Sequence, residues 1–248
     1  MPQDTPRYRQ IAAELRSAIE RGEYPPGTRL PGENAVMQEY GVARMTARQA
    51  LAVLINEGLA VSRKGTGVFV RTFRPIVRNG IARLATERWS SGKTIWSADT
   101  EDRSLTVDEI RVDETAPPDR VALALELEPA ETVIQRSRRF VLDGKPVLVS
   151  VSYLPSKIAK GTAIAQESTG PGGIYARLRD LGHAPVRFRE DLRARMPSES
   201  EIARLALDPA TPVVDIARVA YSDTGQPVEL NEMTADAASY IFRYSFDA

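Results

Sequence analysis

Residues 41–59 read GVARMTARQALAVLINEGL, and this stretch decides the fold of the N-terminal part of the chain. Its small and aliphatic residues recur with the period of a helix, so we predict a helix over residues 44–57 that ends at Gly58. Gly41 gives the backbone the freedom for a sharp corner before this helix. The expected buried face consists of Ala47, Ala50, Leu51 and Leu54. The side chains turned outward are then Arg44, Met45, Arg48, Gln49 and Ala52.

The segments on either side of this helix complete a small unit. Tyr8, Ile11, Leu15 and Ile19 share one helical face, and Gly22 can end that first helix. A second short helix is predicted over residues 33–40, with Ala35, Val36 and Tyr40 inward. After the third helix, two short strands surround a basic turn at residues 64–67. Three helices followed by a hairpin predict a winged helix-turn-helix.

This architecture suggests that the unit binds DNA. The major groove admits an α-helix, and the first turn of a recognition helix is where side chains meet base edges. The predicted DNA-binding residues are Arg44, Met45, Thr46, Arg48 and Gln49 on the helix, and Arg63, Lys64, Gly65 and Thr66 on the hairpin. The alternative for Arg44 and Arg48 is a solvated helix face, and for Lys64 an ordinary hairpin cation.

Composition and charge agree with two domains and limit the chemistry. The chain has 248 residues, no cysteine, a single histidine and no apolar run near the roughly 18 to 20 residues of a membrane span. We therefore expect no metal, no cofactor, no membrane contact and a cytoplasmic location. Residues 1–93 hold 15 Lys and Arg against 8 Asp and Glu, which leaves 33 − 15 = 18 against 33 − 8 = 25 for the rest. A basic N-terminal part suits nucleic acid.

Residues 5–71, above all GTRLPGENAVMQEYGVARMTARQALAVLINEGLAVSRKGTGVFV, resemble the DNA-binding domain of GntR-type bacterial transcription regulators. The resemblance implies that Arg44, Thr46 and Arg48 lie on DNA-contacting positions, with Lys64, Gly65 and Thr66 on the wing. Gly32 and Ala43 stand where that family has helix-capping serine or threonine. Asn34 stands where an arginine is common, and Met45 offers no hydrogen bond, so the operator can differ from the family's usual one.

The remainder of the chain begins with an expected linker and continues with an internal repeat. We predict a DNA-binding domain at residues 1–74, a linker at 75–93 and a second domain at 94–248. Arg78, Arg83 and Arg88 of the linker region either extend the phosphate contacts or are simply solvated. Segments beginning at Leu125 and Leu205 align at an offset of 80, which places Arg138 in register with Arg218; one extra residue in the second turn then aligns Pro146 with Pro227. Two such hairpins predict one antiparallel sheet with pseudo-twofold character.

This second half is similar to the UTRA domain, the effector-binding partner in the HutC-like branch of GntR regulators, which shares the chorismate lyase fold. The segments that carry this similarity are LEPAETVIQRSRRFVLDGKPVLVSVSYLP, IYARL and DPATPVVDIARVAYSDTGQPVEL. The predicted fold class is therefore α+β. By the resemblance, the effector-binding residues are Arg136, Arg138, Ser150, Tyr175 and Glu229. Ser150 replaces a usual glutamate and Ala235 a frequent tyrosine, so the sequence does not predict the phosphosugar ligands familiar in that family.

The alternatives for this pocket are plain structural roles. Arg136 and Arg138 have period-2 spacing and face one side of their strand, which suits an anion, yet each could pair with an acidic residue across the sheet. Tyr175 could be a core residue, and Glu229 a paired or surface carboxylate. The function expected overall is a ligand-responsive repressor, a homodimer on a pseudo-palindromic DNA operator. An effector-independent DNA-binding control protein and a chorismate-lyase-like enzyme remain the alternatives.

Overall fold

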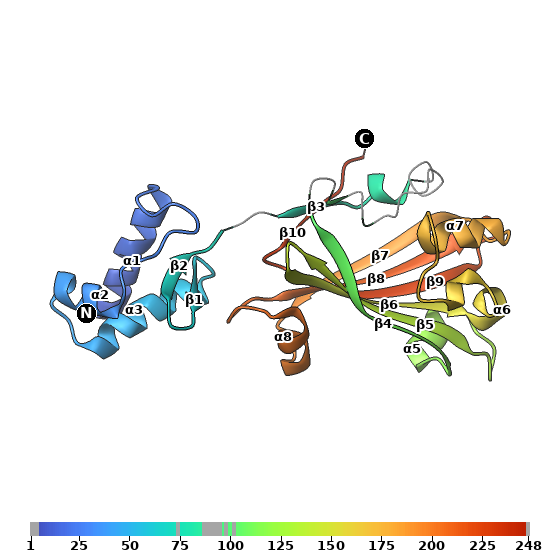
Figure 1. Cartoon of the computed structure of the whole chain (residues 1–248), viewed down its shortest axis with the longest axis horizontal. Coiled ribbons are helices and arrows are strands. Elements are labelled where there is room, and N and C mark those ends of the chain that lie inside the picture. Colours follow the sequence, from blue (N-terminus) through green and yellow to red (C-terminus); the bar gives the residue numbers. More distant parts are fainter. Residues whose placement is uncertain (1–4, 73–74, 86–95, 97–98, 101–102, 247–248) are drawn as a thin grey trace. The chain divides into compact units, whose positions relative to one another are not determined.

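The computed structural model describes residues 5–72, 75–85, 96, 99–100 and 103–246 of the chain. The chain divides into two compact units, one built on residues 1–74 and the other on residues 75–207 and 212–248 (Figure 1). No helix among the described residues combines the length and the apolar character needed to cross a membrane.

The first unit has three helices and a hairpin, as the sequence predicted. They are α1 (Arg7–Glu20), α2 (Glu33–Tyr40), α3 (Arg44–Asn56), β1 (Ala60–Arg63) and β2 (Gly67–Val70). The stripe Ala47, Ala50, Leu51 and Leu54 is buried against α1 and α2. Gly41 closes α2 in the left-handed conformation, at φ 64°, which makes the corner before α3. Gly32 and Ala43 are the N-cap residues of α2 and α3, and neither helix has a side-chain cap, as the sequence implied.

The inward face of α2 is narrower than predicted. Val36 is fully buried and Met37 packs partly against the core, but Ala35 is exposed. A helix of eight residues has just two turns, so it buries one short stripe rather than every apolar side chain. The prediction for Ala35 was wrong.

The second unit is organised around a six-stranded antiparallel sheet in the order β4-β5-β6-β9-β8-β7. The strands are β4 (Leu105–Thr115), β5 (Val133–Leu142), β6 (Lys145–Pro155), β7 (Pro185–Arg195), β8 (Val213–Ser222) and β9 (Pro227–Asp236). This order is symmetric about the boundary between β6 and β9. The predicted single sheet with pseudo-twofold character is confirmed.

The repeat extends to the backbone conformation of the turns. Helices α5 (Asp119–Ala124) and α8 (Glu199–Leu205) occupy equivalent places before the two hairpins. Ala130 and its repeat partner Ala210 both have positive φ, at 70° and 57°. This conformation is uncommon for a residue other than glycine, so its recurrence at the same offset supports a real duplication.

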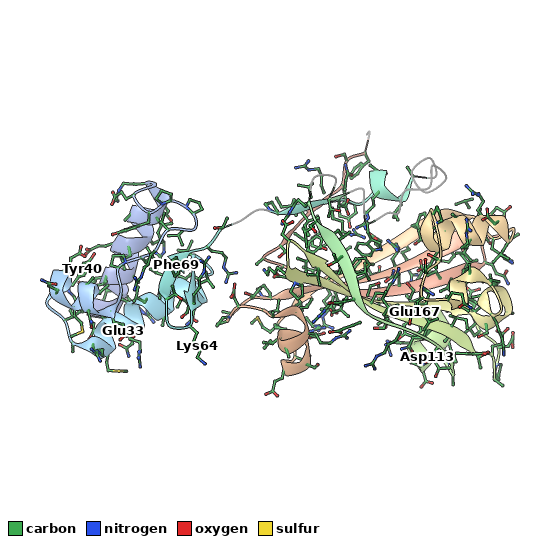
Figure 2. All side chains as sticks on the ribbon, in the orientation of Figure 1. Glu33, Tyr40, Lys64, Phe69, Asp113 and Glu167 are labelled. Carbon is green, nitrogen blue, oxygen red and sulfur yellow. The ribbon has the colours of Figure 1, made fainter. Side chains whose placement is uncertain are left out.

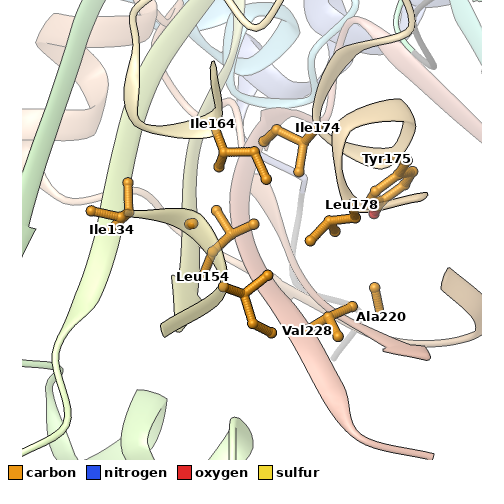
Figure 3. Packing of buried hydrophobic residues seen from close by; sticks show 10 residues of the cluster. Ile134, Leu154, Ile164, Ile174, Tyr175, Leu178, Ala220 and Val228 are labelled. Atoms are coloured by element: carbon orange, nitrogen blue, oxygen red, sulfur yellow. The ribbon is translucent and has the colours of Figure 1, made fainter. Parts of the chain in front are cut away.

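Side chains alternate between the two faces of the sheet and build two cores. On one face Val133, Tyr153 and Leu230 pack with α5, and Leu205 of α8 packs with Val149 and Val213. The opposite face, shown in Figure 3, carries Ile134, Leu154, Ala220 and Val228. They pack against α6 (Ser156–Ala159), the 3-10 turn Ala163–Ala165 and α7 (Gly173–Asp180). This second face also holds the polar side chains described below.

Residues 76–84, which we expected within the linker, instead form regular structure. Strand β3 (Ile76–Asn79) pairs in parallel with β10 (Tyr240–Arg243), and a 3-10 turn follows at Ala82–Leu84. Arg78 and Arg83 are buried, so neither is a solvated cation nor an extension of a phosphate-binding surface. The partner strand lies some 160 positions further along the sequence, where a local pattern cannot indicate it. Arg88 and residues 86–93 lie outside the described residues.

Candidate functional sites

The first two turns of α3 carry the predicted outward side chains. Arg44, Met45, Arg48 and Gln49 are exposed, and Thr46 is half-buried. Met45 is 60% exposed. Ala52, expected outward, is half-buried. The first two turns of this helix therefore present two cations, one amide and one thioether at the surface.

One carboxylate on α2 lies between the two arginines. Glu33 Oε1 accepts a hydrogen bond from Arg48 Nε at 2.9 Å, and Glu33 Oε2 lies 3.9 Å from Arg44 Nε. Asn34 accepts a hydrogen bond from Arg44 Nη2 at 3.3 Å. The arginine side chains remain 64% and 63% exposed, and ion pairs at that exposure contribute at most about 1 kcal/mol. A stronger anion can therefore displace Glu33 at small cost.

The hairpin presents a second cationic surface. Lys64, Gly65 and Thr66 form its exposed tip, and Figure 2 shows Lys64 extending away from the strands. Gly65 has φ 72°, which the tight turn requires. The guanidinium of Arg63 stacks over the Phe69 ring at 4.4 Å, which holds its charge on the hairpin surface.

A groove of about 490 Å³ runs between α3 and the hairpin. Arg29, Arg48, Arg63 and Lys64 line it together with Glu33. Arg29 was not among the predicted DNA-binding residues, because it lies between the first two predicted helices and belongs to neither. At Gly67 an added Cβ would lie 2.8 Å from Arg29 Nε, so the glycine allows the strand to pass close to this side chain. Four cations facing one groove form a surface suited to a phosphate backbone.

The second unit has a small cavity of about 70 Å³ on the α7 face of its sheet. Its lining combines Arg138 of β5, Tyr175 of α7, Arg218 of β8, and Glu229 and Asn231 of β9. Trp96 and residues 169 and 172–174 complete the wall. Three of the five predicted effector residues therefore meet at this cavity: Arg138, Tyr175 and Glu229.

Arg136 lies on the same face of the sheet, but its guanidinium binds backbone carbonyls outside the cavity. Its Nη1 donates to the carbonyls of Ile164 and Gln166, and its Nη2 donates to the carbonyl of Glu167 at 2.9 Å. Burial lowers its pKa to about 10, which leaves the side chain charged at neutral pH. Arg136 thus holds the chain before α7 and does not line the cavity. The hydrogen-bond acceptors found for Arg136 are these backbone carbonyls, rather than the acidic residue considered from the sequence.

Ser150 reaches the cavity indirectly. Its hydroxyl donates to Asn231 Oδ1 at 2.9 Å, and Asn231 lines the wall. Ser150 and Asn231 occupy equivalent repeat positions, offset by 81 after the extra residue of the second turn. Arg218 likewise corresponds to Arg138. We did not include Arg218 or Asn231 among the site residues, although the repeat alignment already pointed to both.

The side chains that line the cavity carry more positive than negative charge, with Arg138 and Arg218 against Glu229. Arg138 Nε, Arg218 Nε and Arg218 Nη1 are buried without a hydrogen-bond partner among the described residues. Arg218 Nη2 lies 3.9 Å from Glu229 Oε2. Burial raises the pKa of Tyr175 well above its usual value, which keeps its hydroxyl neutral. Burial lowers the pKa of Arg218, but Tyr175, Glu229 and Glu190 outweigh that effect and the net shift is upward. Two guanidiniums facing one carboxylate suit an added anion.

Comparison with known proteins assigns both units. The family model "UTRA domain" matches residues 101–241, and the model "Bacterial regulatory proteins, gntR family" matches residues 7–70. The chain belongs to the GntR family of regulators and carries a UTRA domain. It is 26% identical to the HTH-type transcriptional repressor NagR of Bacillus subtilis, over 98% of this chain and 95% of NagR.

Further relatives of this GntR regulator support the same family assignment. It is 27% identical to the mannosyl-D-glycerate transport/metabolism system repressor MngR of Escherichia coli, over 96% of this chain and 94% of MngR. A solved structure described as a GntR-family transcriptional regulator is 26% identical, covers 98% of both chains and has a TM-score of 0.67. These findings confirm the predicted α+β fold class, a DNA-binding transcription regulator with a ligand-binding UTRA domain, and the expectation that the chain is not an enzyme.

Proposed function

We propose that this regulator reads its operator with the first two turns of α3 and contacts the phosphate backbone with the hairpin. The groove with Arg29, Arg48, Arg63 and Lys64 around it supports this assignment best. Arg44, Met45, Thr46, Arg48 and Gln49 approach base edges or nearby phosphates, whereas Arg63, Lys64, Gly65 and Thr66 contact the backbone.

The test is the variant Arg48→Ala, measured on duplexes selected from a random library with the wild-type protein. Loss of a good base contact costs roughly 1 to 3 kcal/mol, or about 5- to 150-fold in affinity. Fluorescence anisotropy gives the affinity, and repeating the selection with the variant gives the preference. Arg21→Ala is the matched control, because Arg21 is also an exposed arginine paired with a carboxylate, at 2.7 Å from Glu23. If Arg48→Ala leaves both the operator affinity and the sequence preference unchanged, Arg48 and α3 do not recognise the operator sequence.

We further propose that a small anionic or polar effector binds in the UTRA cavity and alters operator affinity. Arg138 and Glu229 contact it, joined by Arg218; Tyr175 closes one wall; and Ser150 orients Asn231. Arg136 supports the wall through the carbonyls of residues 164, 166 and 167. A series of small anions is screened by thermal shift. If none raises the melting temperature of a protein that still binds its operator, the effector-independent alternative is favoured.

The regulator is proposed to act in the cytoplasm as a homodimer that represses transcription. A single winged unit reads a short half-site, and two units related by a twofold axis read an inverted repeat. Selected duplexes should therefore contain pseudo-palindromes. Sedimentation of the free protein and of its DNA complex gives the number of chains bound per operator.

A further inference from the structure

Glu190 of β7 is a buried carboxylate placed between two buried arginines. It is 8% exposed, whereas Arg78 and Arg218 are 0% and 1% exposed. Arg78 Nη1 donates to Glu190 Oε2 at 2.9 Å, and Arg78 Nη2 donates to Glu190 Oε1. Arg218 Nη1 lies 3.8 Å from the same Oε1 atom. The carboxylate therefore holds Arg78 firmly and Arg218 loosely.

The loosely held arginine belongs to the effector cavity. Arg218 of β8 is the register partner of Glu190 of β7, and its Nη2 lies 3.9 Å from Glu229 Oε2. Neither distance is a hydrogen bond, and its Nε and Nη1 have unused donor capacity among the described residues. An anion entering the cavity would offer Arg218 the close hydrogen bonds that Glu190 and Glu229 do not provide.

The firmly held arginine belongs to the strand that follows the DNA-binding unit in sequence. Arg78 lies on β3, and residues 71–75 alone separate β3 from the end of β2. Strand β3 is short and is held by parallel pairing with β10, by the Arg78–Glu190 pair and by a close contact at Gly80. An added Cβ at Gly80 would overlap the Tyr244 ring, and the Tyr244 hydroxyl donates to Glu190 Oε2 at 3.3 Å. Glu190 thus anchors both β3 and the segment after β10.

We propose that Glu190 is a positioning residue that couples occupation of the effector cavity to the anchoring of β3. This inference rests on the proposed anion-binding role of the cavity. When the cavity lacks an anion, Glu190 divides its charge between Arg78 and Arg218. A bound anion satisfies Arg218, so Glu190 acts on Arg78 alone and fixes β3 more firmly against β7. Because coupling between sites is reciprocal, firmer anchoring of β3 also strengthens anion binding.

The test uses inorganic phosphate as the probe and the full-length protein. Trp96 lines the cavity, and the chain has two tryptophans, so a Trp89→Phe background leaves Trp96 as the fluorescent reporter of occupancy. Hydrogen exchange of the peptide covering residues 75–84 reports the anchoring of β3, where Ile76 N donates to Ser239 O and Gly80 N donates to Arg243 O.

The decisive variant is the double substitution Arg78→Met with Glu190→Gln. It removes the pair without changing the net charge, and replacing a buried pair by neutral groups is better tolerated than removing one member. Arg120→Met with Glu232→Gln is the control, because this arginine–glutamate pair lies on α5 and β9, outside the cavity lining. Far-ultraviolet circular dichroism verifies that both variants are folded.

In the parent and control proteins, phosphate should change the Trp96 signal and slow exchange of β3 by about 5-fold or more, the lower end of typical coupling. In the double variant, phosphate should still change the Trp96 signal while β3 exchange stays constant. An equal slowing of exchange in the double variant would overturn the coupling and leave the cavity assignment intact. No Trp96 response in the parent protein would overturn the anion site and the coupling together.

Discussion

The arginines of α3 and those of the second unit differ in their exposure to water. Arg48 and Arg78 each bind a single glutamate with short hydrogen bonds, yet their side chains are 63% and 0% exposed. At the surface, water and salt reduce the ion pair to a contribution that another anion can replace. In the interior, loss of a partner leaves an uncompensated charge, so the pair fixes the positions of its strands. We therefore propose that the same residue type serves recognition in one unit and positioning in the other.

The largest effect that would sharpen this comparison is expected for Arg136→Met. The substitution removes the three hydrogen bonds that Nη1 and Nη2 donate to the carbonyls of residues 164, 166 and 167. We expect a loss of about 3 kcal/mol in the free energy of unfolding of the UTRA unit, or a fall of about 6 to 12 °C in melting temperature. Calorimetry measures it.

Arg138→Met is the control for this variant, since Arg138 lies two positions further on the same face. Its Nε has no hydrogen-bond partner among the described residues, so its removal should cost less stability and instead weaken phosphate binding. Equal destabilisation by the two substitutions would show that burial alone, rather than the carbonyl contacts, determines the cost.

An intermediate effect is expected where exposure is intermediate, at Glu201 of α8. Glu201 is 22% exposed and binds Arg195 at 2.6 Å, and the hydrogen bond from Arg195 lowers the pKa of Glu201 to about 2. A lowered folded-state pKa contributes stability that is complete above the unfolded value near 4.5 and is lost as the pH falls toward 2. Glu201→Gln should therefore cost about 1 to 2 kcal/mol at pH 7.

Thermal unfolding between pH 2.5 and pH 7 measures this dependence. The difference between wild type and Glu201→Gln should shrink as the pH falls below about 4.5. A difference that stays constant down to pH 2.5 would mean that Glu201 acts through packing or its capping of α8 rather than through its charge.

The smallest effect is expected for Glu33→Gln, which removes the carboxylate between Arg44 and Arg48. Protein stability should change by less than about 1 kcal/mol, because these pairs are exposed. Non-specific DNA affinity should rise by about 2- to 5-fold, since phosphates no longer compete with Glu33. Anisotropy titrations at two salt concentrations measure the change. Glu39→Gln, an exposed residue on the same helix, should leave the affinity unchanged.

Patterns short in sequence were predictable, and contacts between distant segments were not. The stripe of α3, the corner at Gly41 and the duplicated hairpins follow from helical period, glycine conformation and repeat offset. The repeat even contained Arg218 and Asn231, although we did not use it to extend the site. Arg78 and Arg83 were misjudged as linker cations, because the strand and carboxylates that bury them come from other parts of the chain.

The amino-acid sequence by itself determined which side chains share a face, because the periods of helix and strand are local properties of the backbone. It therefore placed Arg136 and Arg138 on one face of β5, and Arg44 and Arg48 on one face of α3. Only the tertiary structure decided which of these cations is exposed, which donates its hydrogen bonds to backbone carbonyls and which lines a cavity. Those outcomes depend on burial and on partners brought together by long-range packing, and the electrostatic value of a charge changes most with burial.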